Sequence, residues 1–369
     1  MKTVILGAGI SGLAAAYKTG GTVYEAMAQP GGICLSYYVS GYRFENGGGH
    51  WIFGADKSVE RFIGKFVECK RYERKAGVYY NTIYPYPIQN YFKKQIPMSP
   101  IGTMQHYLLN RFGDKLSRMF FFPFNEKYTA GLYDKIVPQD PQKNPKDTQG
   151  YNAEFIYPKN GLDDLINRVA EGVDIRYRKK AHKIDPDKKL VYFADGDSVK
   201  YDRLICTLPL NKTCELLHHP WTPGLIYNST QVLNIGATPG RNIPKEHWLY
   251  VPHCKSGFHR VGFYTNVDHS FAPKNRVALY VEWAVQEYKV PLLKEAIKEL
   301  QGWGFINKVD VTDTCYIDIA YTWTPPGSEE KESLLSMVED CGIEQIGRYG
   351  RWHFQGIAES IKEGLVCSR

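Results

Sequence analysis

Three glycines near the N-terminus are spaced so that they could hold a phosphate group. Gly7, Gly9 and Gly12, in "VILGAGISGLAAAY", lie directly between a strand pattern and a helix pattern. In such a turn the first glycine permits the tight bend, the second lets a pyrophosphate approach the backbone, and the third packs helix against sheet. The helix N-terminus favours that anion. Because Glu25 ends the next strand, where a carboxylate accepts a ribose hydroxyl, the stretch predicts a dinucleotide site rather than a plain glycine turn.

A second set of glycines follows in two short segments, "PGGICLS" (30–36) and "FENGGGHWIF" (44–53). Because glycine lacks a side chain, the pair at 31–32 and the triplet at 47–49 would let the backbone approach a large, flat ligand. His50 directly follows the triplet and is positioned to lie against that ligand. Taken alone, however, such a histidine is more often a hydrogen-bonded residue of the core.

The segment "YPYPIQN" (84–90) combines aromatic rings with side-chain amides. Its two prolines fix φ and remove backbone donors, so they hold Tyr84 and Tyr86 extended. Gln89 and Asn90 add hydrogen-bonding groups beside the rings, a combination that suits recognition of a planar heterocycle by its face and its edge. The alternative is an edge strand broken by prolines, whose aromatic rings belong to the core.

The composition limits the classes of protein to consider. A chain of 369 residues, 43% of them hydrophobic and 23% charged, fits a globular protein of two or three domains. Its eight cysteines are scattered, which is typical of reduced thiols rather than of disulfides or a zinc site, so we expect no metal. The net charge of +7 suits small phosphorylated ligands, and its dispersal along the chain argues against a nucleic-acid partner.

The N-terminal stretch "MKTVILGAG" leaves no room for a signal peptide. No apolar stretch approaches the ~18 residues that a membrane span needs. We therefore expect a soluble, cytoplasmic protein.

Strands and helices must position the glycine turns, His50 and the aromatic segment 84–90. The pattern predicts a strand over 2–6, a helix over 9–18 and a second strand over 21–26, which form a Rossmann-type unit. Helix patterns at about 100–120 and alternating strand patterns from 227 to 325 add a helical part and a mostly antiparallel sheet. The sequence thus predicts an α/β fold of three interwoven parts. The expected residues are 1–56, 160–215 and 328–369 for the dinucleotide-binding part, 57–75 and 93–140 for the helical part, and 76–92, 141–159 and 216–327 for the antiparallel sheet.

With these glycine segments, with "DRLICTLPL" (202–210) and with "GRYGRW" (347–352), the sequence resembles the FAD-dependent amine-oxidase and UDP-galactopyranose-mutase superfamily. In that superfamily a GG…S turn contacts the FAD pyrophosphate, and a GGH loop covers the isoalloxazine ring. The resemblance implies FAD as the cofactor and a flavin-facing role for His50. The cofactor-binding residues that it implies are Gly7, Gly9, Ser11, Gly12, Glu25, Gly31, Gly32, Ser36, Gly48, Gly49, His50, Gly347 and Arg348.

Within the superfamily, "PYPIQN" resembles a segment of eukaryotic-type UDP-galactopyranose mutases whose tyrosine stacks on uracil and whose glutamine bonds the edge of uracil. Ile88 replaces an aromatic residue there. Segments that begin at residues 150, 247, 257 and 321 resemble further mutase strands in the same order, "GYNAEFIYP", "HWLYVP", "GFHRVGFYTN" and "YTWTPP". The substrate-binding residues implied by the resemblance are Tyr86, Ile88, Gln89, Asn152, Tyr250, Arg260, Tyr321 and Phe354.

The resemblance implies a flavin-dependent UDP-sugar mutase, which interconverts pyranose and furanose forms without net redox chemistry. In that family N5 of reduced FAD attacks the anomeric carbon, so an external reductant is needed. His50 and Arg260 are then the expected catalytic residues, with Arg260, Tyr250 and Tyr321 at the diphosphate. An oligomer is possible.

The sequence departs from the mutase pattern at the sugar and diphosphate end. A second diphosphate arginine is missing from 132–149, which holds only lysines, and a tryptophan of the family falls on Thr129. A phosphate-binding tyrosine falls on Phe354 and an asparagine on Ala358. Because phenylalanine cannot hydrogen-bond a phosphate, the resemblance predicts the UDP portion more firmly than it predicts galactose.

Two other functions remain open. One is an FAD-dependent oxidase or desaturase of the same superfamily, which would have an apolar pocket without a clamp for a base. The other is a flavoprotein that binds a nucleotide sugar without turning it over, a function that Phe354 and the missing arginine favour.

Overall fold

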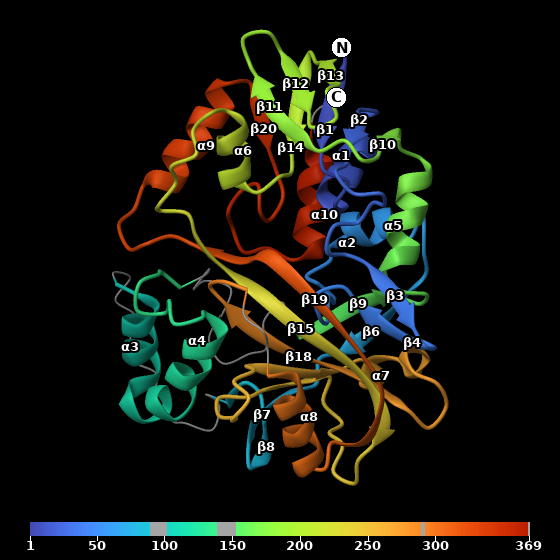
Figure 1. Ribbon diagram of the computed structural model, residues 1–369, viewed down its shortest axis with the longest axis vertical. Coiled ribbons are helices and arrows are strands. Elements are labelled where there is room, and N and C mark those ends of the chain that lie inside the picture. The colour runs from blue at the N-terminus through green and yellow to red at the C-terminus, as the bar shows by residue number, and fades with distance from the viewer. Residues whose placement is uncertain (89–101, 139–152, 289–291, 368–369) are drawn as a thin grey trace.

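The computed structural model describes residues 1–88, 102–138, 153–288 and 292–367. Its elements form two main sheets, both flanked by helices (Figure 1). The smaller sheet lies in the upper part of the view, and the larger one crosses the lower half. Each sheet draws strands from both halves of the sequence, so the chain crosses between them several times.

The smaller sheet is parallel and consists of short apolar strands. β1 (Thr3–Leu6) lies at its centre between β2 (Thr22–Tyr24) and β14 (Arg203–Cys206), while β10 (Ile175–Arg176) and β20 (Ile343–Gln345) form the edges. All neighbouring pairs in this sheet are parallel. Segments such as "TVIL" and "RLIC" suit strands that are covered on both faces. The carboxyl ends of the strands share one edge, where ligands of such sheets bind.

Helices from the two ends of the chain pack together on the parallel sheet. α1 (Ile10–Thr19) lies against α10 (Ile357–Val366) and against α5 (Leu162–Glu171). α10 can approach closely because Gly364 has no side chain: a Cβ there would lie 2.5 Å from the backbone oxygen of Ser11. The first and last helices are therefore direct neighbours.

Residues 57–75 lie elsewhere than predicted. α2 (Lys57–Ile63) packs against α10, and β6 (Cys69–Glu73) pairs with β9 (Glu154–Pro158). Apolar side chains of α2 belong to the same core cluster as α1. The prediction that this stretch joins the helical part is therefore wrong.

The larger sheet is antiparallel apart from one parallel pair, β16 with β7. Its central strands are almost wholly buried, whereas one face of β19 is exposed. In order across the sheet, the strands are β19 (Ile306–Trp323), β15 (Ile226–Pro239), β18 (Val277–Val285), β17 (Arg260–Phe263), β16 (Trp248–Tyr250), β7 (Ala76–Tyr80) and β8 (Thr82–Pro85).

A group of helices packs beside the larger sheet, at the lower left of Figure 1. α3 (Met104–Leu116) continues through a π-helical stretch (Ser117–Phe121) into α4 (Phe122–Tyr128). Their aromatic and aliphatic side chains share a core cluster with Ile88 and Trp323. This cluster anchors the helical part to the sheet.

The remaining elements lie outside the two main sheets. They are β3 (Ser36–Val39), β4 (Tyr42–Glu45), β5 (Ile52–Phe53), β11 (Ala181–Asp185), β12 (Leu190–Phe193), β13 (Ser198–Lys200), α6 (Leu210–Leu216), α7 (Tyr264–Val267), a 3-10 helix (His269–Phe271), α8 (Leu293–Gly302) and α9 (Glu330–Asp340).

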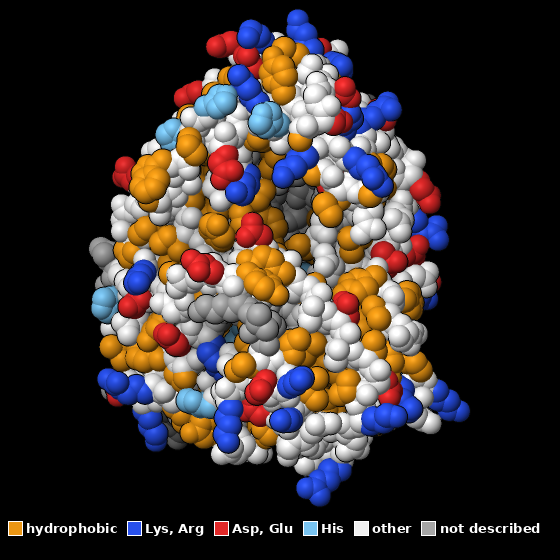
Figure 2. Space-filling model, viewed as in Figure 1, with side chains coloured by type: hydrophobic (Ala, Val, Ile, Leu, Met, Phe, Trp, Pro, Cys, Tyr) orange, Lys and Arg blue, Asp and Glu red, His pale blue; other side chains and the backbone are white. Residues whose placement is uncertain are grey.

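The predicted α/β class, with a Rossmann-type part and a mostly antiparallel sheet, is confirmed. Within the described ranges, none of the helices has the length and apolar character that a membrane crossing requires. Figure 2 shows basic side chains spread over this face of the molecule and interspersed with acidic ones.

Candidate functional site

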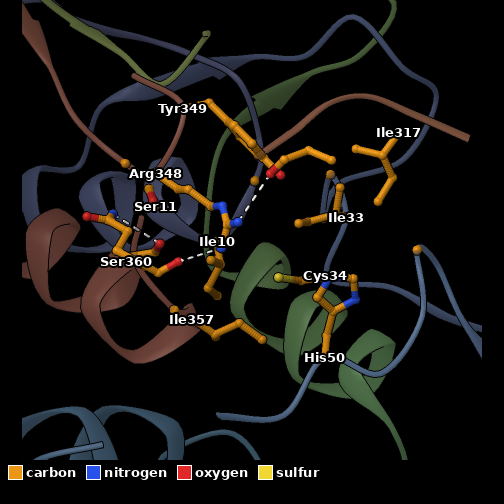
Figure 3. A pocket seen from close by; sticks show the side chains of 18 of the residues that line it. Ile10, Ser11, Ile33, Cys34, His50, Ile317, Arg348, Tyr349, Ile357 and Ser360 are labelled. Atoms are coloured by element: carbon orange, nitrogen blue, oxygen red, sulfur yellow. Dashed lines mark hydrogen bonds between the residues drawn. The ribbon is translucent and has the colours of Figure 1, made fainter. Parts of the chain in front are cut away.

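A cavity of about 390 Å³ begins at the carboxyl edge of the parallel sheet and extends to the larger sheet. Gly7, Glu25, Thr207 and Gly347 follow the ends of β1, β2, β14 and β20, and all four line this cavity. Figure 3 shows side chains of α1, of α10 and of the loop that carries His50 around it. The position matches the crevice in which open α/β sheets bind their ligands.

The first glycine turn has the geometry that a pyrophosphate needs. Gly7 has a φ of +95°, and a Cβ on Gly12 would lie 2.0 Å from the oxygen of Gly7, so both positions require glycine. At Gly9, by contrast, an added Cβ would have no heavy atom of the described residues within 4 Å. The open space lies at the N-terminus of α1, which no side chain in the described ranges caps. This space fits a phosphate group held by the helix N-terminus.

Glu25 already receives two backbone hydrogen bonds. The N–H of Ala8 donates to one carboxylate oxygen at 2.7 Å, and that of Met27 donates to the other at 2.8 Å. Each carboxylate oxygen keeps a second lone pair, and the residue lines the cavity. The carboxylate is thus fixed in place and can still accept a hydroxyl of a ribose.

The glycine pair at 31–32 lies directly beside the first turn. The N–H of Gly31 donates to the oxygen of Ala8 at 2.8 Å, and a Cβ on Gly32 would lie 3.7 Å from the Cα of Gly9. Both glycines line the cavity and have positive φ angles, +117° and +60°. Two glycine turns therefore form one wall of the cavity.

Ser36 is not part of that wall. Its hydroxyl donates to Glu45 at 2.8 Å and accepts the N–H of Leu162 at 2.8 Å, inside a buried cluster with Tyr157. The prediction that Ser36 contacts the cofactor is corrected accordingly. Its hydroxyl joins β3 and β4 to the start of α5 instead.

The glycine triplet is pressed against the larger sheet. A Cβ on Gly48 would lie 2.4 Å from a carboxylate oxygen of Glu282, and one on Gly49 would lie 2.5 Å from the hydroxyl of Tyr280. Gly48 thus serves close packing, while Gly49 also lines the cavity. The close approach of the triplet to the larger sheet places the next residue, His50, in the cavity wall.

His50 presents a buried nitrogen to the cavity. Its Nδ1 atom has no hydrogen-bond partner in the described part of the chain. Burial lowers the pKa of His50 to about 4, an effect that the nearby Glu282 opposes, so the imidazole is neutral at physiological pH. A neutral ring can donate or accept a hydrogen bond, and this one fits the polar edge of a bound ring such as a flavin.

The buried histidines predict how stability depends on pH. Burial lowers the pKa of both His50 and His247 to about 4, whereas an unfolded histidine titrates near 6.5. Between these values the two histidines bind more protons in the unfolded state, so their contribution to the free energy of unfolding should fall as the pH decreases from 6.5 towards 4. Burial raises the pKa of Glu45 to about 8, so this carboxyl contributes in the opposite direction. Urea denaturation of the cofactor-free protein at a series of pH values measures this slope.

A His247→Gln variant should show a flatter slope, because it lacks one of the buried histidines, while His182→Gln, at an exposed histidine, should keep the slope of the wild type. A slope unchanged in His247→Gln would contradict the assignment.

Arg260 lines the far end of the cavity as half of a buried ion pair. Its Nε and Nη2 atoms donate to the two carboxylate oxygens of Glu282 at 2.7 and 2.8 Å, and Glu282 is 1% exposed. Burial raises the pKa of Glu282, but Arg260 and His259 outweigh it and hold the pKa below its usual value, so the carboxylate is ionised. Arg260 is therefore no free cation. Its Nη1 group remains for a ligand.

Arg348 is held by backbone carbonyls and aromatic rings. Its Nη1 and Nη2 atoms donate to the oxygens of Gln355 and Ala320 at 2.9 and 3.1 Å. Its guanidinium carbon lies 4.7 Å from the ring centroid of Phe354 and 5.2 Å from that of Tyr321. All of these residues line the cavity, into which Arg348 brings a positive charge (Figure 3).

The predicted uridine site lies next to the cavity rather than in its wall. The rings of Tyr86 and Tyr250 are 4.9 Å apart, and the guanidinium carbon of Arg74 is 5.4 Å from the Tyr86 centroid. Ile88 is 4% exposed and belongs to the core cluster of α3 and α4, so its predicted substrate contact is replaced by a packing role. Gln89 and Asn152 lie outside the described residues.

Sequence reasoning missed two polar residues of the cavity. Glu282 is the single carboxylate in the apolar strand "VALYVEWAV", a contrast that could have drawn attention to it. Thr230, on β15, lines the cavity with a buried hydroxyl, and no pattern in the sequence distinguishes it from other strand threonines.

Two family models match parts of the chain. Residues 5–66 match a model described as an NAD(P)-binding Rossmann-like domain. Residues 99–228 match one described as a flavin-containing amine oxidoreductase. The first match contains both glycine turns and Glu25.

Several solved structures share the fold along nearly the whole chain. A reduced UDP-galactopyranose mutase has a TM-score of 0.86 at 22% identity, with 99% of this chain and 92% of that chain covered. A double mutant of putrescine oxidase has a TM-score of 0.68 at 14% identity, covering 99% and 97%. A CLA-producing fatty acid isomerase from P. acnes has a TM-score of 0.66 at 14% identity, with the same coverage. These solved structures show the fold that the chain shares with them, and the two family models, together with the dinucleotide cavity, support a flavin amine-oxidase-like protein with FAD as its cofactor.

Proposed function

We propose that this protein is a flavin-dependent UDP-sugar mutase, which interconverts the pyranose and furanose forms of a UDP-linked sugar. The observation that carries the proposal is the group of phenols around Arg260. Tyr321 lines the cavity with Arg260. Tyr250 lies close enough to both residues to raise the pKa of each. Tyr86 continues this group through its ring contact with Tyr250.

These side chains suit a buried diphosphate. Burial acts to lower the pKa of Arg260, but Glu282, Tyr321, Tyr280 and Tyr250 raise it well above its usual value, so the guanidinium keeps its charge. Phenol hydroxyls can donate hydrogen bonds to phosphate oxygens, and the Nη1 group of Arg260 can donate as well. In the proposed reaction they hold the diphosphate as it leaves the sugar.

When bound in its reduced form, FAD supplies the nucleophile for the anomeric carbon. The neutral His50 positions the ring edge through its Nδ1 atom, which has no hydrogen-bond partner among the described residues. Ile317, Ala320 and Phe354 give the cavity apolar surface that excludes water. Gln89 and Asn152 stay in the proposal as contacts to uracil and to the nucleotide sugar.

Arg348 argues against an amine substrate. An amine oxidase would bind its cationic substrate against aromatic rings, where a cation is attracted to the ring face. Here the guanidinium of Arg348 already lies against Tyr321 and Phe354. A cationic amine bound in the same place would be repelled by the positive charge of Arg348 and would clash with its guanidinium.

The Arg260–Glu282 ion pair favours a second candidate function. Because Glu282 neutralises Arg260, the diphosphate would be held more weakly than by two free arginines. A flavoprotein that binds a nucleotide sugar without turnover is therefore the alternative.

One assay separates these functions. The purified protein is incubated with UDP-galactopyranose and related UDP-sugars, with and without dithionite, and the products are followed by chromatography. Isomerisation only in the reduced sample supports the mutase. Oxygen consumption with peroxide formation and no isomerisation would contradict it. Tight binding of UDP without any product would favour the alternative.

A Tyr86→Ala variant tests the proposed uracil contact. Losing one base stack should weaken UDP binding by about 1–3 kcal/mol, while the absorption spectrum of the bound flavin stays unchanged. Tyr84→Ala is the matched control, because Tyr84 also directly precedes a proline but is 41% exposed. Equal losses in both variants would contradict the assignment.

A further inference from the structure

Thr230 carries a hydroxyl that the described part of the chain leaves without a partner. The residue lies on β15, lines the cavity and is 3% exposed. Its Oγ1 atom is buried and has no hydrogen-bond partner among the described residues. Because an unsatisfied buried hydroxyl is unfavourable, its retention at the cavity wall indicates that a bound molecule completes its hydrogen bonding.

The register of the larger sheet identifies the surroundings of this hydroxyl. Thr230 pairs with Ile317 on β19 and with Ala284 on β18. Glu282 lies two residues before Ala284, so it points to the same face, and it pairs with Arg260 on β17. Thr230, Glu282 and Arg260 all line the cavity. A hydroxyl, a carboxylate and a guanidinium therefore follow one another across three neighbouring strands.

This polar row carries no net charge. Arg260 gives two of its donor groups to Glu282, and the two charges cancel. What remains for a ligand is a hydroxyl that donates and accepts, carboxylate lone pairs that accept, and the Nη1 group that donates. In the proposed function the Nη1 group serves the diphosphate, whereas the hydroxyl of Thr230 and the lone pairs of Glu282 match a neutral group that carries several hydroxyls. Among the parts of a nucleotide sugar, the sugar ring has that character.

We propose that Thr230 is a specificity-determining residue whose hydroxyl hydrogen-bonds a hydroxyl group of the sugar carried by UDP. The inference rests on the proposed UDP-sugar function. It assigns the sugar to the sheet face at Thr230 and Glu282.

Two substitutions at this position separate the hydroxyl from the shape of the side chain. Thr230→Val removes the hydroxyl but keeps a β-branched residue on the strand, and Thr230→Ser keeps the hydroxyl. Thr265→Val is the matched control: Thr265 is 5% exposed, but its hydroxyl donates to the backbone of Ala278. Each variant, with oxidised FAD bound, is titrated by calorimetry with UDP and with UDP-galactopyranose. The absorption spectrum of the flavin is recorded without ligand.

Thr230→Val should bind UDP-galactopyranose about three- to tenfold more weakly than the wild type, the loss expected for one hydrogen bond between neutral groups. Its affinity for UDP alone and its flavin spectrum should stay unchanged. Thr230→Ser and Thr265→Val should bind both ligands as the wild type does.

Three results would overturn the inference. They are an equal loss of affinity for UDP and for UDP-galactopyranose, no loss for either, and a shifted flavin spectrum in unliganded Thr230→Val, which would place the hydroxyl at the cofactor. A wild-type protein that binds neither ligand would end the proposed function and this inference together. Binding by the wild type that Thr230→Val leaves intact would end this inference alone.

Discussion

The Arg260→Met variant should lose about 3–5 kcal/mol of unfolding free energy, the scale expected when one partner of a buried ion pair is removed. The loss arises from Glu282, which is 1% exposed and would keep a buried charge without its bidentate partner. The Nε2 atom of His259 lies 3.4 Å from this carboxylate, but burial lowers the pKa of His259, so this histidine is a poor substitute for the arginine. Guanidinium denaturation of the cofactor-free protein measures the change.

The double variant Arg260→Met/Glu282→Leu should recover most of this loss, because it replaces both charges by apolar groups of similar volume. As a control, Arg118→Met removes an exposed arginine that is paired with Asp114, and it should change stability by less than about 1 kcal/mol. A single Arg260→Met variant as stable as the wild type would contradict the buried pair.

Gly9→Val should reduce the affinity for FAD by about 100-fold or more, which corresponds to about 3 kcal/mol, while leaving the cofactor-free fold intact. The backbone at Gly9 has a φ of −67°, which any residue adopts, and a Cβ there meets only open space among the described residues. The added side chain would fill that space, in which we expect the pyrophosphate. Gly9→Ala should give a smaller loss in the same direction. Flavin fluorescence quenching measures the affinity.

Gly12→Ala is the informative comparison. A Cβ at Gly12 would lie 2.0 Å from the oxygen of Gly7, so this variant should be destabilised even without FAD. Gly302→Ala, at an open helical position, should affect neither property. If Gly9→Val retained normal FAD affinity, the pyrophosphate would have to bind elsewhere.

The cofactor side of the cavity could be predicted from the sequence because its geometry is local. Gly7, Gly9 and Gly12 lie within one strand–turn–helix unit, and their spacing indicates the position of each glycine in the turn. Neighbouring residues determine such turns, so no knowledge of distant contacts is needed.

The far side of the cavity could not be predicted in the same way. Thr230 and Glu282 become neighbours only through the register of β15 with β18, and a shift of one residue between these strands would put the two side chains on opposite faces of the sheet. The pairing of Arg260 with Glu282 depends on the same register, one strand further. Ser36 shows the converse: its local motif suggested a cofactor contact, but Glu45 on the paired strand β4 engages its hydroxyl.

The packing of α10 against α1 affects when the protein can acquire its cofactor during synthesis. Ile357 and Ser360 of α10 line the cavity, and Glu363 accepts the backbone N–H of Gly347. The glycine turn of α1 leaves the ribosome long before α10, which forms the opposite wall of the cavity. Until α10 has emerged, a nascent chain carries an open, incomplete nucleotide site. FAD capture must therefore wait for the synthesis of α10.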